Sequence, residues 1–391
     1  MRIAEDVALG TLVERIATWN PSSSSRDGWF DYIDLSAVDQ HSKRIVEARK
    51  VLGSDAPSRA RQIVATDDVL VSTVRPNLNG VAQVPCELDG ATASTGFCVL
   101  RPKADLLDAC YLFQWVKSPQ FISEMVRRAT GASYPAVSDR IILESSIPLP
   151  PLPEQRRIAA ILDQAEALRA KRWAAGAELD TLLWSSFFDF FGDPVTNPRG
   201  CKRIPLAELS NINDCPHSTP SWTIDGMVCL RTSNLTEGGW NWNDKRFVSE
   251  ATYVERTRRG VIESGDIILS REGTVGVAAI VQEDMQVCMG QRLVQVRPAR
   301  SLLTPEFLLL HLLYVLSPSR ISRLMVGSTA QHLNVKDLKA LKIPVPPLED
   351  QQSFAALASK IEQLKTAQRT SSGCLDALFT SLQHRAFRGE L

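Results

Sequence analysis

The 391-residue sequence lacks the short motifs that mark the common active sites. It has no G-x-x-x-x-G-K phosphate loop, no G-x-S-x-G nucleophile elbow and no H-E-x-x-H pair of zinc-binding histidines. The Asn-Pro-Pro-aromatic run of amino-methyltransferases is missing too, because Asn20-Pro21 and Asn197-Pro198 are followed by serine and arginine. We therefore expect no catalytic residues, no metal site and no bound cofactor in this chain.

Net charge, paired cysteines and long apolar runs are also missing. Lys plus Arg and Asp plus Glu number 44 each, so any basic surface must be local. The eight cysteines form no C-x-x-C pair, which argues against zinc and predicts free thiols in a reducing compartment. The longest apolar run, 302–316, is broken by Pro305, Glu306 and His311 and predicts a core helix. With no signal-peptide pattern at residues 1–10, we expect a cytoplasmic protein.

A repeated segment is the strongest positive signal. Residues 147–191 begin IPLPPLPEQ, and residues 343–387 begin IPVPPLEDQ and align with them without a gap. The prolines predict an extended link, because proline fixes φ and lacks an N–H donor. Acidic residues then follow at the expected start of a helix. A helix over 154–191 would be roughly 57 Å long at about 1.5 Å per residue.

Apolar residues recur at 3-4 spacing along both predicted helices. A helix with one apolar stripe cannot bury it alone, so we expect the two helices to pack on each other. An antiparallel, coiled-coil-like pair would need the shortest connections. Two unrelated amphipathic helices on local cores are the alternative. The predicted packing residues are Ile158, Ile161, Leu168, Leu179, Leu182, Phe354, Leu357, Ile361, Leu364, Leu375 and Leu378.

The segments before the two helices repeat as well. Predicted strands at 68–72 and 97–100 have counterparts at 266–270 and 293–296, and predicted helices at 109–126 and 307–325 follow. We predict an α+β fold of two homologous mixed α/β globules with pseudo-twofold symmetry. The predicted domains are globule 1 (1–146), link and helix 1 (147–196), globule 2 (197–342), and link and helix 2 (343–391).

Polar loop tips recur in both predicted globules. Forked and amide side chains there are of the kind that reads base edges in DNA, and the neighbouring glycines would let backbone approach a phosphate. Ordinary polar loops with turn glycines are the alternative. The candidate DNA-binding residues are Arg75, Asn77, Asn79, Tyr134, Arg271, Thr274, Gln331, His332, Asn334 and Lys336.

The repeated proline motif, with DVLVSTVRPN at 68–77 and DIILSREGTVG at 266–276, resembles the DNA-specificity subunit of Type I restriction–modification systems over the whole chain. The resemblance implies that each globule is a target-recognition domain reading one half of a bipartite, asymmetric site in double-stranded DNA. It implies that the helices set the spacer and dock methyltransferase (modification) subunits, with a motor-nuclease (restriction) subunit joining. S-adenosylmethionine, ATP and Mg²⁺ would then bind those partners.

Two other functional classes fit parts of this pattern. A protein–protein adaptor could use the duplicated globules on protein ligands and bind no DNA. A nuclease or methyltransferase in its own right would need an active site that the motifs do not indicate.

Overall fold

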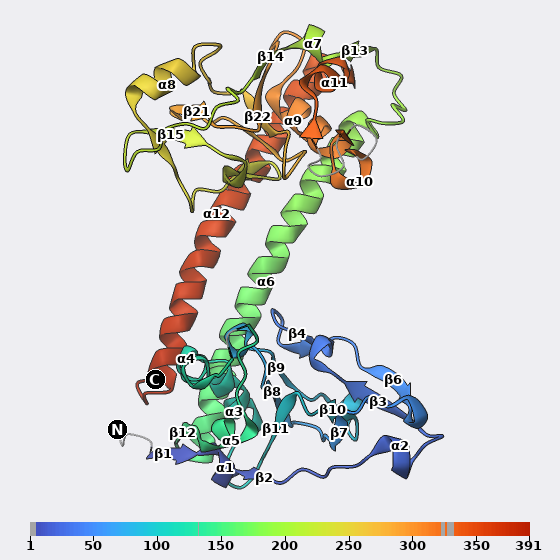
Figure 1. The fold of residues 1–391 in the computed structure, drawn as a ribbon, viewed down its shortest axis with the longest axis vertical. Helices are drawn as coiled ribbons and strands as arrows, with labels where there is room; N and C mark the ends of the chain where they lie inside the picture. The colour runs from blue at the N-terminus through green and yellow to red at the C-terminus, as the bar shows by residue number, and fades with distance from the viewer. Residues whose placement is uncertain (1–4, 132, 322–324, 327–331) are drawn as a thin grey trace. The chain divides into compact units, whose positions relative to one another are not determined.

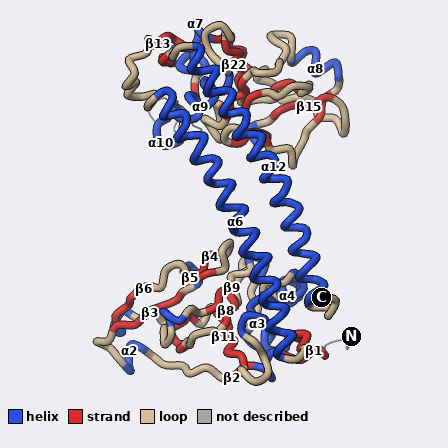
Figure 2. Tube along the Cα trace, turned by 180° about the vertical axis from the view of Figure 1, so that it is seen from behind, coloured by secondary structure: helices blue, strands red, loops and turns tan. Residues whose placement is uncertain are grey.

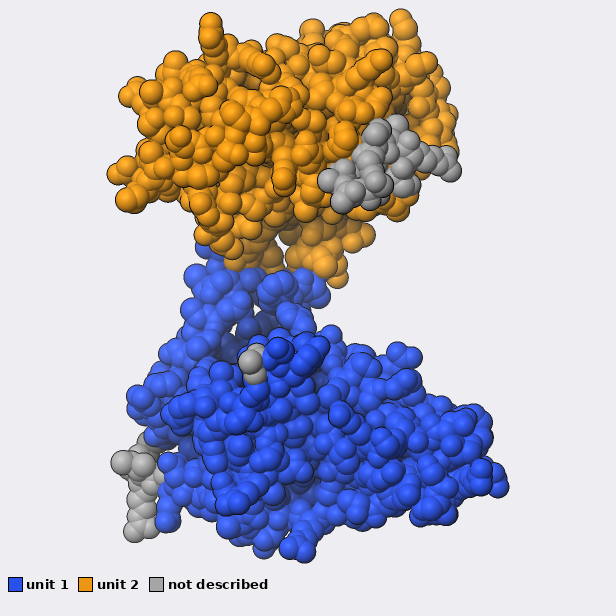
Figure 3. Space-filling model, viewed as in Figure 1, with its two compact units in different colours: residues 1–174, 370–391 blue, residues 175–369 orange. Residues whose placement is uncertain are grey.

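The computed structural model describes residues 5–131, 133–321, 325–326 and 332–391. They form two compact units, which we call unit 1 (1–174 with 370–391) and unit 2 (175–369) (Figure 3). Two long helices, α6 (Leu152–Phe191) and α12 (Leu348–Ala386), each pass from one unit into the other without a break (Figures 1 and 2). Each unit therefore contains the first part of one helix and the last part of the other.

Unit 1 contains two four-stranded sheets. The first has the order β2-β11-β8-β9 and is antiparallel. The second has the order β6-β3-β10-β7, with β3 and β10 parallel. Along the chain, the helices and strands of unit 1 before α6 are β1 (Glu5–Ala8), α1 (Leu9–Leu12), β2 (Val13–Glu14), α2 (Pro21–Ser24), β3 (Trp29–Ile33), β4 (Val38–Asp39), β5 (Arg44–Ile45), β6 (Arg49–Leu52), β7 (Ala60–Ile63), β8 (Val69–Ser72), β9 (Val81–Gln83), β10 (Thr92–Ser94), β11 (Phe97–Pro102), α3 (Ala109–Val116), α4 (Pro119–Arg128), α5 (Asp139–Glu144) and β12 (Ser146–Leu149).

Unit 2 repeats this plan. Its first sheet has the order β14-β22-β19-β20, and its second the order β18-β15-β21 with β15 and β21 parallel. Its elements are β13 (Arg203–Pro205), α7 (Leu206–Leu209), β14 (Ser210–Asp214), β15 (Met227–Leu230), β16 (Leu235–Thr236), β17 (Gly239–Trp240), β18 (Phe247–Val248), α8 (Glu250–Arg256), β19 (Ile267–Ser270), β20 (Ala278–Ile280), β21 (Val287–Met289), β22 (Leu293–Pro298), α9 (Pro305–Val315), α10 (Pro318–Ile321), β23 (Met325–Val326), β24 (His332–Leu333), α11 (Val335–Ala340) and β25 (Lys342–Pro344).

The central strand of each first sheet is apolar on both faces. In β8, Val69 and Val71 belong to one core and Leu70 to another. Successive side chains of a strand point to opposite faces, so a continuous apolar run can serve two cores at once. The matching strand β19 does the same with Ile268 facing away from Ile267 and Leu269. The mixed α+β class and the repeat are therefore confirmed.

A buried glutamine joins α6 to unit 1. The Gln155 Oε1 accepts a hydrogen bond from the Asp108 N–H at 2.9 Å, at the start of α3. Its Nε2 donates to the carbonyls of Leu106 at 3.0 Å and Pro150 at 2.8 Å. One side chain thus ties the proline link, the helix and the loop before α3 together.

The same arrangement recurs in unit 2. The Gln351 Oε1 accepts from the Thr304 N–H at 3.0 Å, and its Nε2 donates to Leu302 at 3.0 Å and Pro346 at 2.9 Å. Both glutamines are fully buried. The sequence repeat is therefore also a repeat of hydrogen bonds.

In unit 1, α6 and α12 contact each other through ion pairs and rings. Arg157 donates to the Leu391 carbonyl at 3.0 Å, and Arg169 bonds to Asp376 at 2.7 Å. The Arg169 guanidinium also lies over the Phe379 ring, 4.5 Å from its centroid. Rising residue numbers on α6 meet falling numbers on α12 and the residues after it, so the two segments run antiparallel within this unit.

In unit 2 the order of contacts is again reversed between the helices. Lys365 Nζ lies 2.8 Å from Asp180 Oδ1, and the Phe354 and Phe191 ring centroids are 5.3 Å apart. Burial disfavours the charge of Lys365, but hydrogen bonds to Asp180 and Glu362 outweigh it and hold the pKa of Lys365 above its ordinary value. Polar pairs thus join the two helices beside the aromatic contacts within this unit.

The predicted packing residues divide into two groups. Ile158, Phe354 and Ile361 are buried. The half-buried residues are Ile161, Leu179, Leu357 and Leu375. The prediction is wrong for the four leucines that are exposed, namely Leu168 (58%), Leu182 (46%), Leu364 (57%) and Leu378 (62%).

Packing against the globule explains this difference. In unit 1, α6 also contacts α3 and the residue after it, where Gln114 bonds to Asp163 at 2.7 Å and Lys117 to Glu166 at 2.6 Å. The buried stripe must serve both neighbours, so it does not keep the strict 3.5-residue period of a two-helix seam. Leu162 is buried in this stripe although the seam pattern omits it.

The predicted helices at 109–126 and 307–325 are each interrupted. Ser118 accepts a hydrogen bond from the Phe121 N–H and caps α4, with Pro119 at its first position. The proline lacks the N–H that a continuous helix would need. In unit 2 the break falls between α9 and α10, again before a proline, Pro318. No helix in the described part of the chain is both long and apolar enough to span a membrane.

Replacing Gln351 by leucine should destabilise unit 2. The substitution removes three hydrogen bonds and leaves a buried N–H and two carbonyls without partners, so we expect a loss of about 3 kcal/mol in the free energy of unfolding. Urea unfolding followed by circular dichroism measures it. Gln352→Leu, at the exposed neighbouring position, is the control. Equal midpoints for the two variants would contradict the role given to Gln351.

Candidate nucleic-acid interface

The loop after β8 is shaped by two residues with positive φ. Arg75 has φ 51° and Asn79 has φ 47°, one on each side of a 3₁₀ turn at Pro76–Leu78. The Arg75 N–H donates to the Pro135 carbonyl at 2.7 Å, and the Val137 N–H donates to Thr73 at 2.8 Å. These bonds join the loop after β8 to the segment 134–137, which are far apart in the sequence.

Two candidate side chains of unit 1 meet where these segments join. The Arg75 guanidinium lies over the Tyr134 ring, 4.7 Å from its centroid. Tyr134 is 68% exposed, and Arg75 and Asn77 are exposed as well. A cation held on an exposed aromatic face is suited to a phosphate or a base edge.

A lysine that was not among the sequence candidates forms a hydrogen bond to the backbone of this loop. Lys43 Nζ donates to the Asn79 carbonyl at 2.6 Å. Burial, with the nearby positive charge of Lys117, lowers the pKa of Lys43. Lys43 has φ 57° in a polar turn, and no local sequence pattern singles it out. Asn79 is half-buried, whereas Asn77 and Leu78 before it are exposed.

Arg271 of unit 2 is placed differently from Arg75. It is 7% exposed, and its Nε lies 3.2 Å from Asp214 Oδ1. Its Nη2 lies 3.6 Å from Glu272 and 3.5 Å from His217 Nδ1. In this conformation Arg271 orders its acidic neighbours and does not face solvent. The only sequence feature that could have drawn attention to this cluster around Arg271 was Cys215-Pro216-His217. It resembles one half of a zinc motif, and the other half is missing.

The remaining candidates of unit 2 lie around the loop after β19. Thr274 and Lys336 are exposed, and Asn334 occupies the N-cap position of α11. His332 forms a β-bridge with Glu272. Gln331 lies outside the described residues. Gly276, with φ 91°, is needed for packing, because a Cβ there would come within 2.2 Å of the Leu316 carbonyl.

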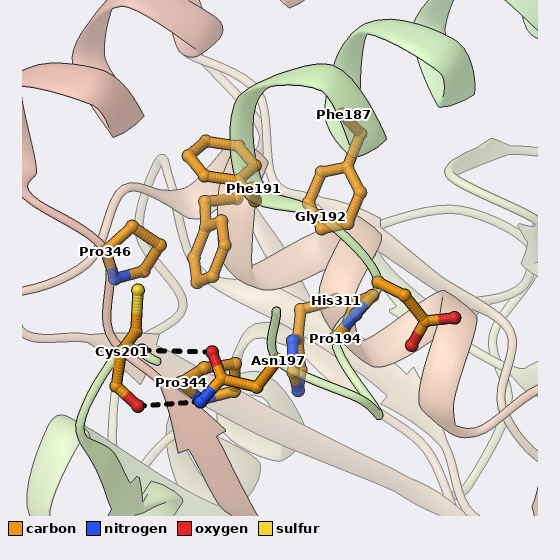
Figure 4. A pocket seen from close by; sticks show the side chains of 11 residues that line it. Phe187, Phe191, Gly192, Pro194, Asn197, Cys201, His311, Pro344 and Pro346 are labelled. Atoms are coloured by element: carbon orange, nitrogen blue, oxygen red, sulfur yellow. Dashed lines mark hydrogen bonds between the residues drawn. The ribbon is translucent and has the colours of Figure 1, made fainter. Parts of the chain in front are cut away.

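A small apolar pocket in unit 2 contains the buried His311 (Figure 4). Phe187, Phe191 and Phe307 line it, and neither His311 ring nitrogen has a hydrogen-bond partner among the described residues. Burial, with the charge of Arg203, lowers the pKa of His311 to about 3, so the ring is neutral. Asp193 also lines the pocket, and its carboxylate accepts a hydrogen bond from the Tyr314 hydroxyl at 2.6 Å. No cluster of three metal-binding side chains occurs among the described residues.

Comparisons with known proteins agree on one family. The family model described as Type I restriction modification DNA specificity domain matches residues 63–172 and 227–371. The chain is 25% identical over 283 residues to the Type I restriction enzyme MjaVIII specificity subunit of Methanocaldococcus jannaschii, with 68% of this chain and 66% of that protein covered. It is 24% identical to the Type I restriction enzyme EcoBI specificity subunit of Escherichia coli, with 70% and 64% covered.

A solved structure is similar over the full length. That structure is described as the structural basis of complex assembly and conformational transition of the type I R-M system. The two chains are 28% identical and superpose with a TM-score of 0.66, and the match covers 100% of this chain and 99% of the other. The chain spans just under two thirds of the two curated relatives named above. Because the family model matches once in each unit and covers most of the chain, this protein belongs to the family of Type I restriction–modification DNA specificity subunits.

Proposed function

We propose that this chain is the sequence-specific DNA-recognition subunit of a Type I restriction–modification complex. The observation that carries the proposal is the double family match, once in each unit. Each match includes the loop after the central strand, at Arg75 or Arg271, and the segment before the proline link. The relatives named above are described as specificity subunits. Nothing in these comparisons favours the adaptor alternative.

The two units are proposed to read different half-sites. Their scaffolds share strand order and the buried glutamine, but the loops differ in chemistry. The unit 1 loop presents an exposed arginine on a tyrosine, while Arg271 in unit 2 is held by Asp214. Different side chains on the same scaffold recognise different bases, which yields an asymmetric, bipartite target.

The long helices are proposed to form an antiparallel coiled coil with pseudo-twofold symmetry that sets the interval between half-sites. The opposed contacts within each unit support this pairing. The exposed leucines at 168, 182, 364 and 378, together with Trp173 at 56% exposure, support docking of methyltransferase subunits along the helices. Large apolar side chains exposed on a helix can be buried by a partner protein.

The chemistry is proposed to belong to the partner subunits. Methyltransferase subunits would bind S-adenosylmethionine and methylate adenine, and a motor-nuclease subunit would use ATP and Mg²⁺. This chain would bind DNA and its partners and would carry out no covalent step.

Methylation mapping tests the proposed function directly. Cells that contain this chain and its methyltransferase should carry methyladenine in a motif of two specified parts around an unspecified spacer. Exchanging residues 1–146 for another recognition domain should change one part only. One continuous motif would contradict the proposal.

Arg75→Gln should weaken recognition of one half-site. The substitution keeps a hydrogen-bonding amide but removes the charge and the fork, so we expect about tenfold weaker binding of the target duplex. Fluorescence anisotropy measures the affinity, and duplexes altered in each half-site locate the effect. Arg140→Gln is the control, because Arg140 is exposed and pairs with Glu144 in the same unit. An equal loss at both half-sites would count against base reading by Arg75.

Lengthening both helices should lengthen the spacer. Insertion of four residues after Ala174 and four after Ser372 adds roughly 6 Å of helix at about 1.5 Å per residue, which is about two base steps of DNA. We expect the methylated motif to gain about two unspecified base pairs. A variant with the four-residue insertion in only one of the two helices serves as the control, because it puts the contacts between the helices out of register. An unchanged spacer would remove the helices from this role.

A further inference from the structure

Unit 2 presents a nearly fully exposed isoleucine on an ordered loop. Ile224 is 98% exposed in the segment 219–226 that leads into β15. The loop is held by the Thr223 N–H, which donates to Phe247 at 2.9 Å, and by the Thr223 hydroxyl, which donates to Asp225 at 2.6 Å. Gly226 has φ 121°, and a Cβ there would come within 2.5 Å of the Val248 carbonyl. The loop therefore holds Ile224 outward, away from the cores of unit 2.

Aromatic rings with cations over their faces lie in the same part of unit 2. Arg246 lies over the Trp222 ring at 5.8 Å, and Lys245 lies over the Trp242 ring at 5.3 Å. Trp242 in turn stacks on Trp240, with centroids 5.4 Å apart and planes 16° apart. Trp222 belongs to the loop of Ile224, and β18, which follows Arg246, pairs with β15. Aromatic rings interleaved with cations are the composition of surfaces that stack on bases and contact phosphates.

Two acidic residues lie next to these groups in the sequence, Asp225 beside Ile224 and Asp244 beside Lys245. Asp244 pairs with Arg231 and lies 3.7 Å from Arg246. Hydrogen bonds from Arg231 lower the pKa of Asp244, and the positive charge of Arg231 balances the negative charge of this carboxylate. Asp225 is exposed, and the cations Lys245 and Arg246 outnumber it, because Asp244 is paired with Arg231. These charges are compatible with a groove of DNA.

Unit 1 exposes an aromatic residue at the start of the matching strand. Trp29 opens β3 and is 69% exposed. β3 is the counterpart of β15. Each is the earlier strand, in chain order, of the parallel pair in the second sheet of its unit, namely β3 with β10 and β15 with β21. The Arg49 guanidinium lies over Tyr32 of the same strand, 5.9 Å from its centroid. An exposed large apolar residue near a cation–aromatic pair therefore occurs in both repeats, as Trp29 in unit 1 and Ile224 in unit 2.

We propose that the segment 219–226 enters a groove of the DNA, where Ile224 packs as an apolar wedge against the bases. Arg246 and Lys245, held on Trp222 and Trp242, contact the phosphates on either side. Inserted apolar side chains of this kind unstack base steps and bend the duplex. This inference rests on the proposed DNA-recognition function and assigns it a second contact surface, apart from the loop at Arg271.

The experiment uses the full chain assembled with its methyltransferase and a labelled duplex carrying its methylation motif. Ile224→Ala should weaken binding about tenfold, because burial of the isoleucine side chain on DNA is lost. Arg246→Gln and Lys245→Gln should each reduce the slope of log affinity against log salt by about one. A duplex with 2-aminopurine at successive positions of the second half-site should show a fluorescence rise at one step, which Ile224→Ala abolishes.

Val195→Ala is the matched control, since Val195 is 53% exposed in the same unit, in the segment that follows α6. Binding by Ile224→Ala equal to that of Val195→Ala, with wild-type binding intact, would overturn the wedge and leave the proposed function standing. Weaker assembly with the methyltransferase at unchanged DNA affinity would also overturn it, by showing a protein-binding surface. Failure of the wild-type complex to bind its motif would refute the proposed function itself.

Discussion

A buried glutamine at the start of each long helix fixes how the helix meets its globule. Gln155 and Gln351 each join three backbone groups that would otherwise be buried without partners. The prolines before them cannot donate hydrogen bonds, so the link depends on side chains for its polar contacts. Without this bonded side chain, the link and the loop before α3 or α9 would lose their shared partner. The loops at Arg75 and Arg271 belong to the same globules and so depend indirectly on this contact.

The two units show how one scaffold supports different surfaces. The ion pair of Arg101 with Asp68 recurs as Arg297 with Asp266, so the strand framework is conserved between repeats. In both, the hydrogen-bonded carboxylate holds the pKa of the arginine above its ordinary value. The loops built on this framework diverge, with an exposed Arg75 in unit 1 and a buried Arg271 in unit 2. A rigid framework with variable loops allows the recognised bases to change without a change of fold.

The structure places the candidate DNA-binding residues of the two units differently. Sequence reasoning placed Arg75 and Tyr134 among the candidates, and the structure brings them into contact. It offered Arg271 as a base reader, whereas the structure holds that side chain against Asp214. It gave no weight to Ile224, because a single apolar residue in a polar loop has no pattern until its exposure is known.

The sequence by itself determined the duplication, the proline links, the two long helices and the strands at the centre of each unit. These features follow from local rules: proline geometry, strand alternation and helical periodicity act over a few residues. Only the tertiary structure decided which apolar positions are buried, as Leu162 and Leu168 on α6 show. It also decided which polar side chains face solvent, because burial and ion pairing depend on residues distant in the chain. Arg271 is buried beside a residue of another strand, a contact that no local pattern specifies.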